Sequence, residues 1–346
     1  MKKVLSGLIC HSERQRRISF LRCFTSFSMT VAMATVICVS PCFAKQKISL
    51  PDFIFDGKPV DAKAISMGES FSAVCDNASV SYWNPAGLKQ LEGKYFTTCI
   101  NTSHKTDASD DELFAGDSLQ GKKLIFIGFA NSKSAFSFRP ISDYSSVFEV
   151  KKIELRANKY TFSSASQYTN KMQLGININY ISAHLGVTDL INPTANISDG
   201  NGIAVDFGLL YTAYKFVKLG FSIENSPGYI WWTDYKRNII KSHIRAGLSV
   251  KPADWLLMSF DYENIASIKK EFYHGGLQQT LAKHVFFRQG IISEKFFNNS
   301  DKKSLTFGGG YELKKWIIDF AAKLYQLENT GKSKVTDYTF SLSMSF

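Results

Sequence analysis

The sequence of 346 residues lacks long apolar runs and is poor in proline. Beyond residue 44 no apolar run approaches the roughly 20 residues that a transmembrane helix needs, which excludes a bundle of such helices. Only 8 Pro and 23 Gly are present, too few for a collagen-like or linker-dominated chain. By contrast, 28 Phe, 15 Tyr and 5 Trp are too many aromatic residues for a chain that stays disordered. The sequence therefore predicts a folded, aromatic-rich protein.

Residues 1–44 have the pattern of a signal peptide. Six basic residues and one acid precede an uncharged stretch, 28–40, and Cys42-Phe43-Ala44 places small residues at positions −3 and −1 of a cleavage site. The pattern predicts cleavage after Ala44, so that the exported chain begins at Lys45. Because the basic stretch is unusually long, the true translation start stays open.

Without residues 1–44 the composition changes. Six positive charges and one negative charge are lost, which lowers the formal net charge from +11 to +6. The remaining Lys and Arg are scattered singly or in pairs, so we do not expect a nucleic-acid partner. Of six cysteines only Cys75 and Cys99 remain, which gives no framework of metal ligands. An oxidising compartment would permit a bridge between them, and two free thiols are the alternative.

From residue 94 onward, apolar and polar residues alternate. In 203–211 the odd-numbered residues are apolar, from Ile203 to Tyr211, whereas Asp206 and Gly208 lie between them. The same pattern occurs in 172–180, 217–224, 244–250 and 337–346. Side chains alternate across a strand, so each stretch predicts a strand with one apolar and one polar face.

Strand length distinguishes a membrane barrel from a soluble sandwich. Strands of globular proteins average about 5–6 residues, whereas a tilted membrane strand needs about 9–11. The alternation predicts fourteen mostly long strands, at 94–102, 122–130, 133–139, 149–163, 172–186, 201–214, 216–226, 238–251, 253–263, 271–280, 283–292, 303–313, 315–325 and 335–346. Because 133–139 and 149–163 are weakly defined, twelve strands are the alternative.

The lengths of the predicted connections alternate as well. Tight turns are expected near 131–132, 215, 252, 281–282 and 314, and long polar loops at 103–121, 187–200, 227–237, 293–302 and 326–334. This asymmetry is typical of an outer-membrane barrel, whose short turns lie in the periplasm. Aromatic residues near strand ends suit the girdles at the membrane interfaces; they are Tyr229, Trp231, Trp232, Trp255 and Trp316. The sequence thus predicts an all-β, antiparallel transmembrane barrel, with a soluble β-protein as the alternative.

Residues 64–91 contain several spaced motifs. They read Met67-Gly68, Phe71, Ala73-Val74, Asp76-Asn77-Ala78-Ser79 and Trp83-Asn84-Pro85-Ala86-Gly87-Leu88. Together they resemble the N-terminal signature of the FadL/PorV group of outer-membrane β-barrels. Glu69, Ser70 and Cys75 depart from the usual pattern, and a looser resemblance covers most of 57–346.

The resemblance implies an organisation and a function. Residues 45–92 would form a small hatch, or plug, inside a barrel of residues 93–346. In one interpretation Asn84, Pro85 and Ala86 move to open a path for an apolar substrate; in the other the hatch is purely structural. The implied function is passive uptake of hydrophobic, fatty-acid-like molecules, and the alternative is a PorV-like scaffold or shuttle in an envelope or secretion complex. Outer-membrane lipid and the barrel-assembly machinery are the expected partners.

No catalytic, metal or cofactor site is predicted. The histidines after residue 44 show no spacing such as H-E-x-x-H; they are His104, His184, His243, His274 and His284. Asp110-Asp111 lies in an acidic polar stretch and is interpreted as solvated.

Charged residues on the polar faces of the strands should point into the lumen. They carry both signs and comprise Asp206, Lys218, Glu224, Lys241, His243, Arg245, Asp261, Arg288, Asp319 and Lys323. They predict an internal network of salt bridges, with a polar pore lining as the alternative. Asp206, Arg245 and Asp261 are the candidate binding residues of the lumen.

The last strand alternates as far as Phe346. An apolar face that continues to this residue predicts that the strand is held along its length by pairing with the strand near 94–102. Outer-membrane barrels resemble one another in having such an aromatic residue, so Phe346 is expected to act as an assembly signal.

Overall fold

The computed structural model describes residues 54–106, 119, 123–148, 150–191, 194–265, 270–296, 302–326 and 334–346, together with Lys45, Lys47, Ile48 and Leu50. Residues 46–346 belong to one compact unit. The predicted signal peptide, residues 1–44, and the Asp110-Asp111 pair lie outside the described residues. Within the described part, no helix is both long and apolar enough to cross a membrane.

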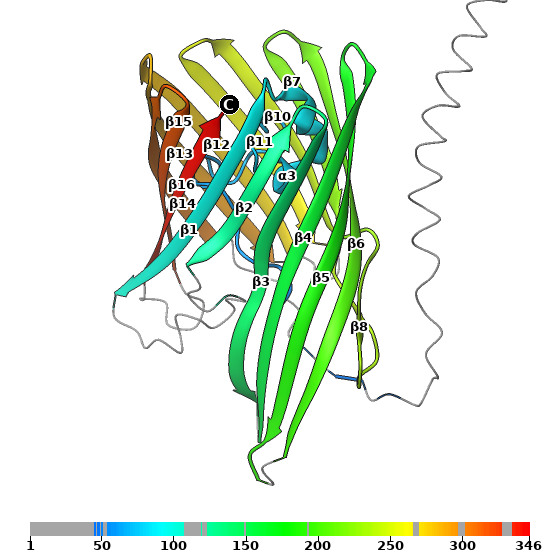
Figure 1. Ribbon diagram of the computed structural model, residues 1–346. Coiled ribbons are helices and arrows are strands. Elements are labelled where there is room, and N and C mark those ends of the chain that lie inside the picture. Colours follow the sequence, from blue (N-terminus) through cyan, green and yellow to red (C-terminus); the bar gives the residue numbers. More distant parts are fainter. Residues whose placement is uncertain are drawn as a thin grey trace, which may run out of the picture. The chain divides into compact units, whose positions relative to one another are not determined.

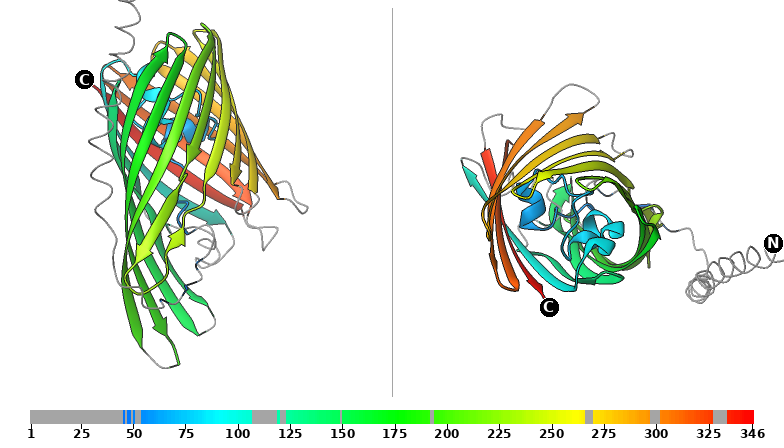
Figure 2. Two further views of the ribbon diagram at one scale, coloured as in Figure 1. Left: turned by 90° about the vertical axis from the view of Figure 1, so that its right-hand side faces the viewer. Right: turned by 90° about the horizontal axis from the view of Figure 1, so that it is seen from above.

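Sixteen strands of the described chain form a single antiparallel sheet. They are β1 (Lys94–Thr106), β2 (Leu124–Asn131), β3 (Ser134–Phe148), β4 (Lys151–Thr169), β5 (Met172–Asp189), β6 (Ala195–Tyr214), β7 (Val217–Glu224), β8 (Gly228–Trp232), β9 (Asn238–Ile239), β10 (His243–Ala253), β11 (Leu256–Ile265), β12 (Lys270–Ala282), β13 (Val285–Phe296), β14 (Lys302–Leu313), β15 (Trp316–Gln326) and β16 (Lys334–Ser345). All except the short β8 and β9 form a closed ring of fourteen (Figures 1 and 2). The predicted fourteen-strand antiparallel barrel is confirmed.

The ring closes between its first and last strands. β1 and β16 pair in continuous register from Tyr95 opposite Ser345 to Thr106 opposite Lys334. Beyond this ladder, Lys94 N donates to Phe346 O at 3.1 Å and Phe346 N donates to Lys94 O at 3.0 Å. The last strand is therefore held along its whole length, as its unbroken alternation predicted.

The alternation also assigned the faces correctly in the membrane part of the wall. Phe207, Phe221 and Phe340 are exposed on the outside, whereas Asp206 and Ser341 are buried inside. Six tight turns connect β2 to β3, β4 to β5, β6 to β7, β10 to β11, β12 to β13 and β14 to β15, all at one end of the barrel. In outer-membrane barrels this is the periplasmic end.

Two predicted boundaries are wrong around residues 225–242. The expected loop 227–237 contains β8, and the expected strand 238–251 is divided into β9 and β10. On the side away from β5, β6 has two partners because it is longer than β7. It pairs with β7 from Phe207 to Tyr214 and with β8 from Gly200 to Ala204. Between these ladders Ser226 N donates to Val205 O, which bridges the interruption.

Strands β3 to β6 extend farther than predicted. β4, β5 and β6 contain 19, 18 and 20 residues, and most of the expected loops at 140–148 and 187–200 is strand. Figure 1 shows these strands projecting beyond the others at the end opposite the tight turns. We call the projecting part the outer lobe; it comprises residues 140–148, 151–158, 181–189, 195–204 and β8.

In the outer lobe the two faces exchange polarity. On β4, Tyr160 and Phe162 face outward in the membrane part, but Glu154 and Arg156 face outward in the outer lobe, where Leu155 is buried inside. On β5 the outward residues change from Ile178 and Tyr180 to Ser182 and His184, while Ile181, Ala183 and Leu185 are buried. The outer lobe is thus built like a soluble β-protein, with water outside and an apolar interior.

Residues 54–92 lie inside the ring of strands (Figure 2, view from above). We call them the inner segment. Its regular elements are α2 (Ala62–Ser66), α3 (Val80–Trp83) and the 3-10 helix η2 (Pro85–Gln90). Helix α2 does not continue past Met67, because Gly68 and Glu69 adopt positive φ angles of 65° and 63°.

Candidate functional site

The inner segment contacts the wall through a ring of glycines. Eight inward-facing glycines lie against it on eight different strands: Gly128, Gly175, Gly208, Gly220, Gly247, Gly276, Gly290 and Gly308. A Cβ atom on Gly290 would lie 2.2 Å from Gly68 N, and one on Gly175 would lie 2.3 Å from Ala86 N. A side chain at any of these positions would run into backbone or side-chain atoms of the inner segment, and at Gly128, Gly247 and Gly308 into atoms of the wall as well.

The predicted tripeptide Asn84-Pro85-Ala86 packs against β5 and β6. Asn84 caps η2, since its Oδ1 accepts from Ala86 N at 3.1 Å. Its Nδ2 donates to Ser72 O at 2.9 Å and to Leu209 O at 3.0 Å. These bonds connect two parts of the inner segment to β6, so any displacement of the tripeptide requires their loss. Movement of the tripeptide stays a prediction.

Two buried aspartates hold the inner segment. Asp261 Oδ2 on β11 accepts from Phe71 N at 3.0 Å and from Ser72 N at 2.8 Å. Asp61 belongs to the segment itself and accepts from Asn77, Ser79 and Ser341. Burial raises the pKa of Asp61, and the nearby carboxylate of Asp319 raises it further. The predicted lumen candidate Asp261 is therefore a support for the inner segment.

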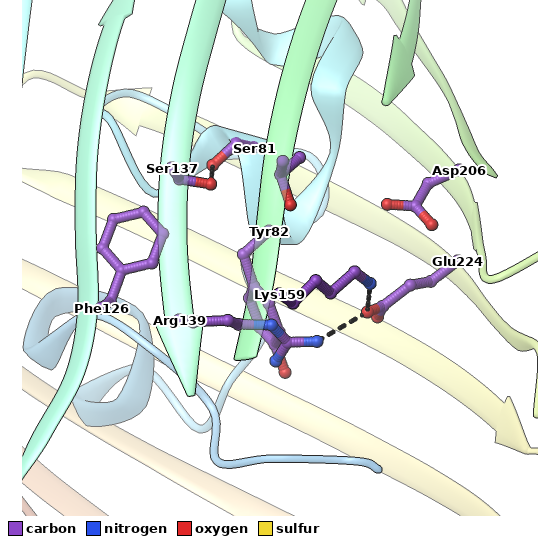
Figure 3. Close-up of a pocket in the computed structure, with 9 residues that line it drawn as sticks. Ser81, Tyr82, Phe126, Ser137, Arg139, Lys159, Asp206 and Glu224 are labelled. Atoms are coloured by element: carbon purple, nitrogen blue, oxygen red, sulfur yellow. Dashed lines mark hydrogen bonds and ion pairs between the residues drawn. The ribbon is translucent and has the colours of Figure 1, made fainter. Parts of the chain in front are cut away.

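A charged layer crosses the lumen beside the inner segment. Glu224 accepts from Arg139 at 2.9 Å and from Lys159 at 3.0 Å (Figure 3). It also lies 3.4 Å from Arg245. Arg245 also pairs with Glu263 at 2.8 Å. All five side chains are buried. Three cations share two carboxylates, so each buried charge has at least one partner of opposite sign, as buried charges require.

Tyr82 of the inner segment completes this layer. The guanidinium of Arg139 lies 4.5 Å from the centre of its ring and that of Arg245 lies 5.3 Å from it. Burial raises the pKa of Tyr82 to about 12, so the phenol is neutral at ordinary pH. The inner segment and the wall are thereby joined by cation–π contacts as well as by hydrogen bonds.

Very little space remains in the layer. Its cavity has a volume of only about 10 Å³ and is bordered by Asp206, which accepts from the side chains of Asn177 and Asn179 and from Asn225 N. A space of about this size holds at most one water molecule. At this point the charged layer therefore leaves room for about one water molecule.

The predicted lumen charges are mostly paired. Arg245, Arg288, Asp319, Lys323 and Glu224 form ion pairs, which confirms the expected internal network for them. Asp206 and Asp261 instead accept from amide donors. Sequence reasoning missed Arg139 and Lys159, which lie opposite each other on β3 and β4, because those two strands were the weakly defined ones. Because the alternation in 133–139 and 149–163 was poorly defined, it did not show that Arg139 and Lys159 face the lumen.

An apolar cluster lies inside the outer lobe, next to the charged layer. Its buried members from the wall are Ile141, Tyr144, Ile153, Leu155, Ala157, Ile181, Ala183, Leu185, Ala204, Ile230, Trp232 and Ile240. Ile54 and Phe55 at the start of the inner segment belong to it, and Ile48 and Leu50 pack on it. We call this group of packed side chains the outer chamber. The expected interfacial position of Trp232 is wrong: the side chain is 3% exposed because it points into this chamber, whereas Trp231 is 38% exposed.

Within the described residues, the backbone pairing around the chamber is interrupted on one side. β2 and β3 pair over only four residues of each strand, from Ile127 opposite Phe138 to Ala130 opposite Ala135. From Arg139 to Phe148, β3 keeps its pairing with β4 but has no ladder to β2 within the described residues. The strands around the chamber thus separate between β2 and β3.

The two cysteines after residue 44 are not bridged. Cys75 and Cys99 are buried free thiols, so the disulfide alternative is wrong. Burial raises the pKa of Cys75 well above its ordinary value, which keeps this thiol un-ionised. No group of three or more His, Cys, Asp or Glu side chains in the described part is placed to hold a metal ion.

Comparison with solved structures identifies the fold. No protein-family model and no curated protein match the sequence. The CymD monoaromatic hydrocarbon channel matches with a TM-score of 0.60 at 16% identity, over 85% of this chain and 99% of that chain. A Pseudomonas aeruginosa FadL homologue matches with a TM-score of 0.61 at 11% identity, over 84% and 99%. The Pseudomonas putida toluene transporter TodX matches with a TM-score of 0.55 at 12% identity, over 84% and 99%. The FadL-like outer-membrane barrel fold predicted from residues 64–91 is confirmed.

Proposed function

We propose that this barrel carries small hydrophobic molecules across the outer membrane by passive diffusion. The observation that supports this most strongly is the outer chamber, an apolar interior in a part of the barrel whose outer face is polar. An apolar molecule gains about 25 cal/mol for each Å² of its surface that leaves water. The side chains of the chamber are packed on one another and on Ile48, Leu50, Ile54 and Phe55, so a passenger would gain this apolar contact by displacing that part of the chain. The printed names of structures with the same fold describe channels for hydrocarbons.

The charged layer makes a straight route along the barrel axis unfavourable. An apolar molecule that crossed it would have to separate buried ion pairs such as Arg139–Glu224, and breaking a buried pair costs about 3–5 kcal/mol. The missing ladder between β2 and β3 offers a route without this cost. We therefore propose that the passenger leaves the outer chamber sideways, between these strands, into the membrane.

The electrostatics of the chamber favour an uncharged passenger. The cations closest to it along β3 and β4, Arg139 and Lys159, are both bonded to Glu224. A carboxylate would have to compete with Glu224 for them. Neutral aromatic or aliphatic hydrocarbons are thus the proposed class, and fatty-acid-like molecules are the narrower alternative to be tested beside them.

Uptake into cells or proteoliposomes tests the proposal. Leu155→Asn places an amide in the chamber, and Arg156→Asn makes the matched change on the outward face of the next residue. We expect wild type and Arg156→Asn to take up radiolabelled toluene equally, and Leu155→Asn to take it up at least several-fold more slowly at an equal amount of folded barrel. Labelled palmitate measured in parallel separates the two substrate classes.

Equal uptake by wild type, both variants and protein-free vesicles would refute the channel proposal. A scaffold role, the PorV-like alternative, would then be favoured if stoichiometric protein partners copurify with the barrel from cross-linked membranes.

A further inference from the structure

Lysines that are scattered in the sequence gather at the periplasmic end of the barrel. Each of the six tight turns carries or adjoins at least one, and Lys94 begins β1 at the same end. We call the group the lysine rim; it comprises Lys94, Lys133, Lys171, Lys215, Lys251, Lys283, Lys314 and Lys315, all exposed. Every second connection between strands lies at the same end of an antiparallel barrel, so lysines that are far apart in the sequence meet there.

Few negative charges compensate the rim. Asp76, Glu92, Asp254 and Glu312 are acidic side chains at or near this end of the described chain. Among the described residues, Lys251 is the rim lysine that forms an ion pair, with Asp254 at 3.3 Å. The turns at Lys133, Lys171, Lys215 and Lys283 contain no acid. The rim thus presents a ring of positive charge.

Exposed aromatic residues indicate where the lysine rim lies relative to the membrane. Tyr168 is 67% exposed, Tyr214 is 68% exposed and Trp255 is 55% exposed, and each lies within four residues of a rim lysine. Tyr and Trp occupy the boundary between hydrocarbon and headgroups, and a lysine extends its ammonium from that boundary toward the water. The rim lysines therefore lie at the level of lipid headgroups.

One rim lysine borders a surface hollow. Thr169, Asn170, Lys171 and Tyr211 line an open depression of about 550 Å³ at the turn between β4 and β5. It combines an ammonium, polar groups and an aromatic ring, the chemistry that suits a phosphate on one side and the start of an acyl chain on the other.

We propose that the lysine rim binds the anionic headgroups of phospholipids in the periplasmic leaflet. A lysine near an anionic lipid surface contributes about 1 kcal/mol, which is roughly a fivefold change in affinity. A lipid is favoured over a soluble protein partner because the lysines adjoin the lipid-facing aromatic residues around the whole circumference. This inference is independent of the transport proposal.

Native mass spectrometry of the purified full chain tests the inference. The barrel is exchanged into an equal mixture of phosphatidylglycerol and phosphatidylcholine with identical acyl chains, and the lipids retained on it are counted. The rim variant carries Lys→Gln at positions 133, 171, 215 and 283, and the control carries Lys→Gln at positions 151, 152, 236 and 303 at the opposite end. We expect roughly fivefold enrichment of phosphatidylglycerol on wild type and control, falling toward onefold on the rim variant and in high salt.

Three results would overturn the proposal. They are no enrichment on wild type, enrichment that persists on the rim variant, and displacement of the lipid by an equal concentration of glycerol 3-phosphate. The last result would indicate a site for free phosphate. If wild type shows no enrichment but an acidic protein copurifies with it and not with the rim variant, the rim is a protein-docking surface.

Discussion

Gly275 and Gly276 are neighbours on β12 but face opposite sides of the wall. A Cβ atom on Gly276 would lie 2.3 Å from Met67 O of the inner segment, whereas one on Gly275 meets only Ile291 at 3.4 Å. We expect Gly276→Ala to destabilise the packed inner segment by about 1–3 kcal/mol, the usual cost of overpacking. Gly275→Ala should be close to neutral.

Limited proteolysis checks this difference. Cleavage within 54–92 should be faster in Gly276→Ala than in wild type, with the barrel strands still resistant. Equal protection in both variants would mean that the inner segment does not depend on the glycine ring.

Glu224 is the residue on which the charged layer depends. Its replacement by Gln leaves Arg139, Lys159 and Arg245 with one carboxylate fewer, and removing one partner of a buried ion pair costs about 3–5 kcal/mol. Glu154→Gln is the matched control, since Glu154 pairs with Lys152 on the exposed face and should contribute at most about 1 kcal/mol.

Urea unfolding in detergent, followed by tryptophan fluorescence, measures both variants. Comparable losses of stability for Glu224→Gln and Glu154→Gln would show that the layer is hydrated and contributes no more than a surface pair.

At the scale of elements, alternation predicted the strands well only where the outer face meets lipid. On β5 the apolar positions change phase at Tyr180-Ile181, two adjacent apolar residues of which the first faces out and the second faces in. A periodic pattern read with a fixed phase gives no support to a strand beyond such a step. The predicted strand 133–139 ended before the outer lobe and the predicted strand 201–214 began inside it, and β3 and β6 were therefore predicted too short. β8 was missed because Pro227 and Gly228 are typical of loops.

The inner segment is the element whose removal has the clearest predicted effect. Deleting residues 64–90 removes the backbone that lies against the glycine ring and the Tyr82 ring between the two guanidinium groups. A barrel of fourteen strands leaves a water-filled opening unless something fills it. We expect the deletion to raise single-channel conductance in planar bilayers at least several-fold.

The deletion variant must first show that its barrel is closed, by its migration in an unheated SDS gel. A closed barrel with the conductance of wild type would mean that the wall residues alone block the lumen.

At the scale of the whole molecule, closure depends on β16. Phe346 is 52% exposed on the outer face, and its backbone exchanges two hydrogen bonds with Lys94. Phe346→Asp places a charge on this face and should lower the amount of folded barrel in the outer membrane, while export stays normal. Ser345→Asp, one residue earlier, is the positional control.

Membrane fractionation and heat-modifiable migration measure the result. A wild-type level of folded Phe346→Asp protein would refute its role as an assembly signal.

The closed fold could be predicted from sequence because every strand of a lipid-facing wall places apolar residues outward and polar residues inward in alternation. The interior follows no such rule. Charges from distant strands, such as Arg139 and Glu224, meet there through the curvature of the sheet, and the mixture of lumen charges predicted ion pairs without predicting their partners. The outer chamber was not predicted at all, because its residues are apolar on the face that is polar elsewhere.

The position of the inner segment in the chain has a consequence for the order of folding. It precedes β1, yet its contacts reach strands from β2 to β16 around the ring. A segment that came after the strands would have to be threaded into a finished cylinder. Here the strands can instead gather around a segment already made, each adding its glycine or polar anchor, and the β1–β16 ladder can form last. The inner segment would then act as a template during folding, and its size would determine how many strands the barrel needs to close around it.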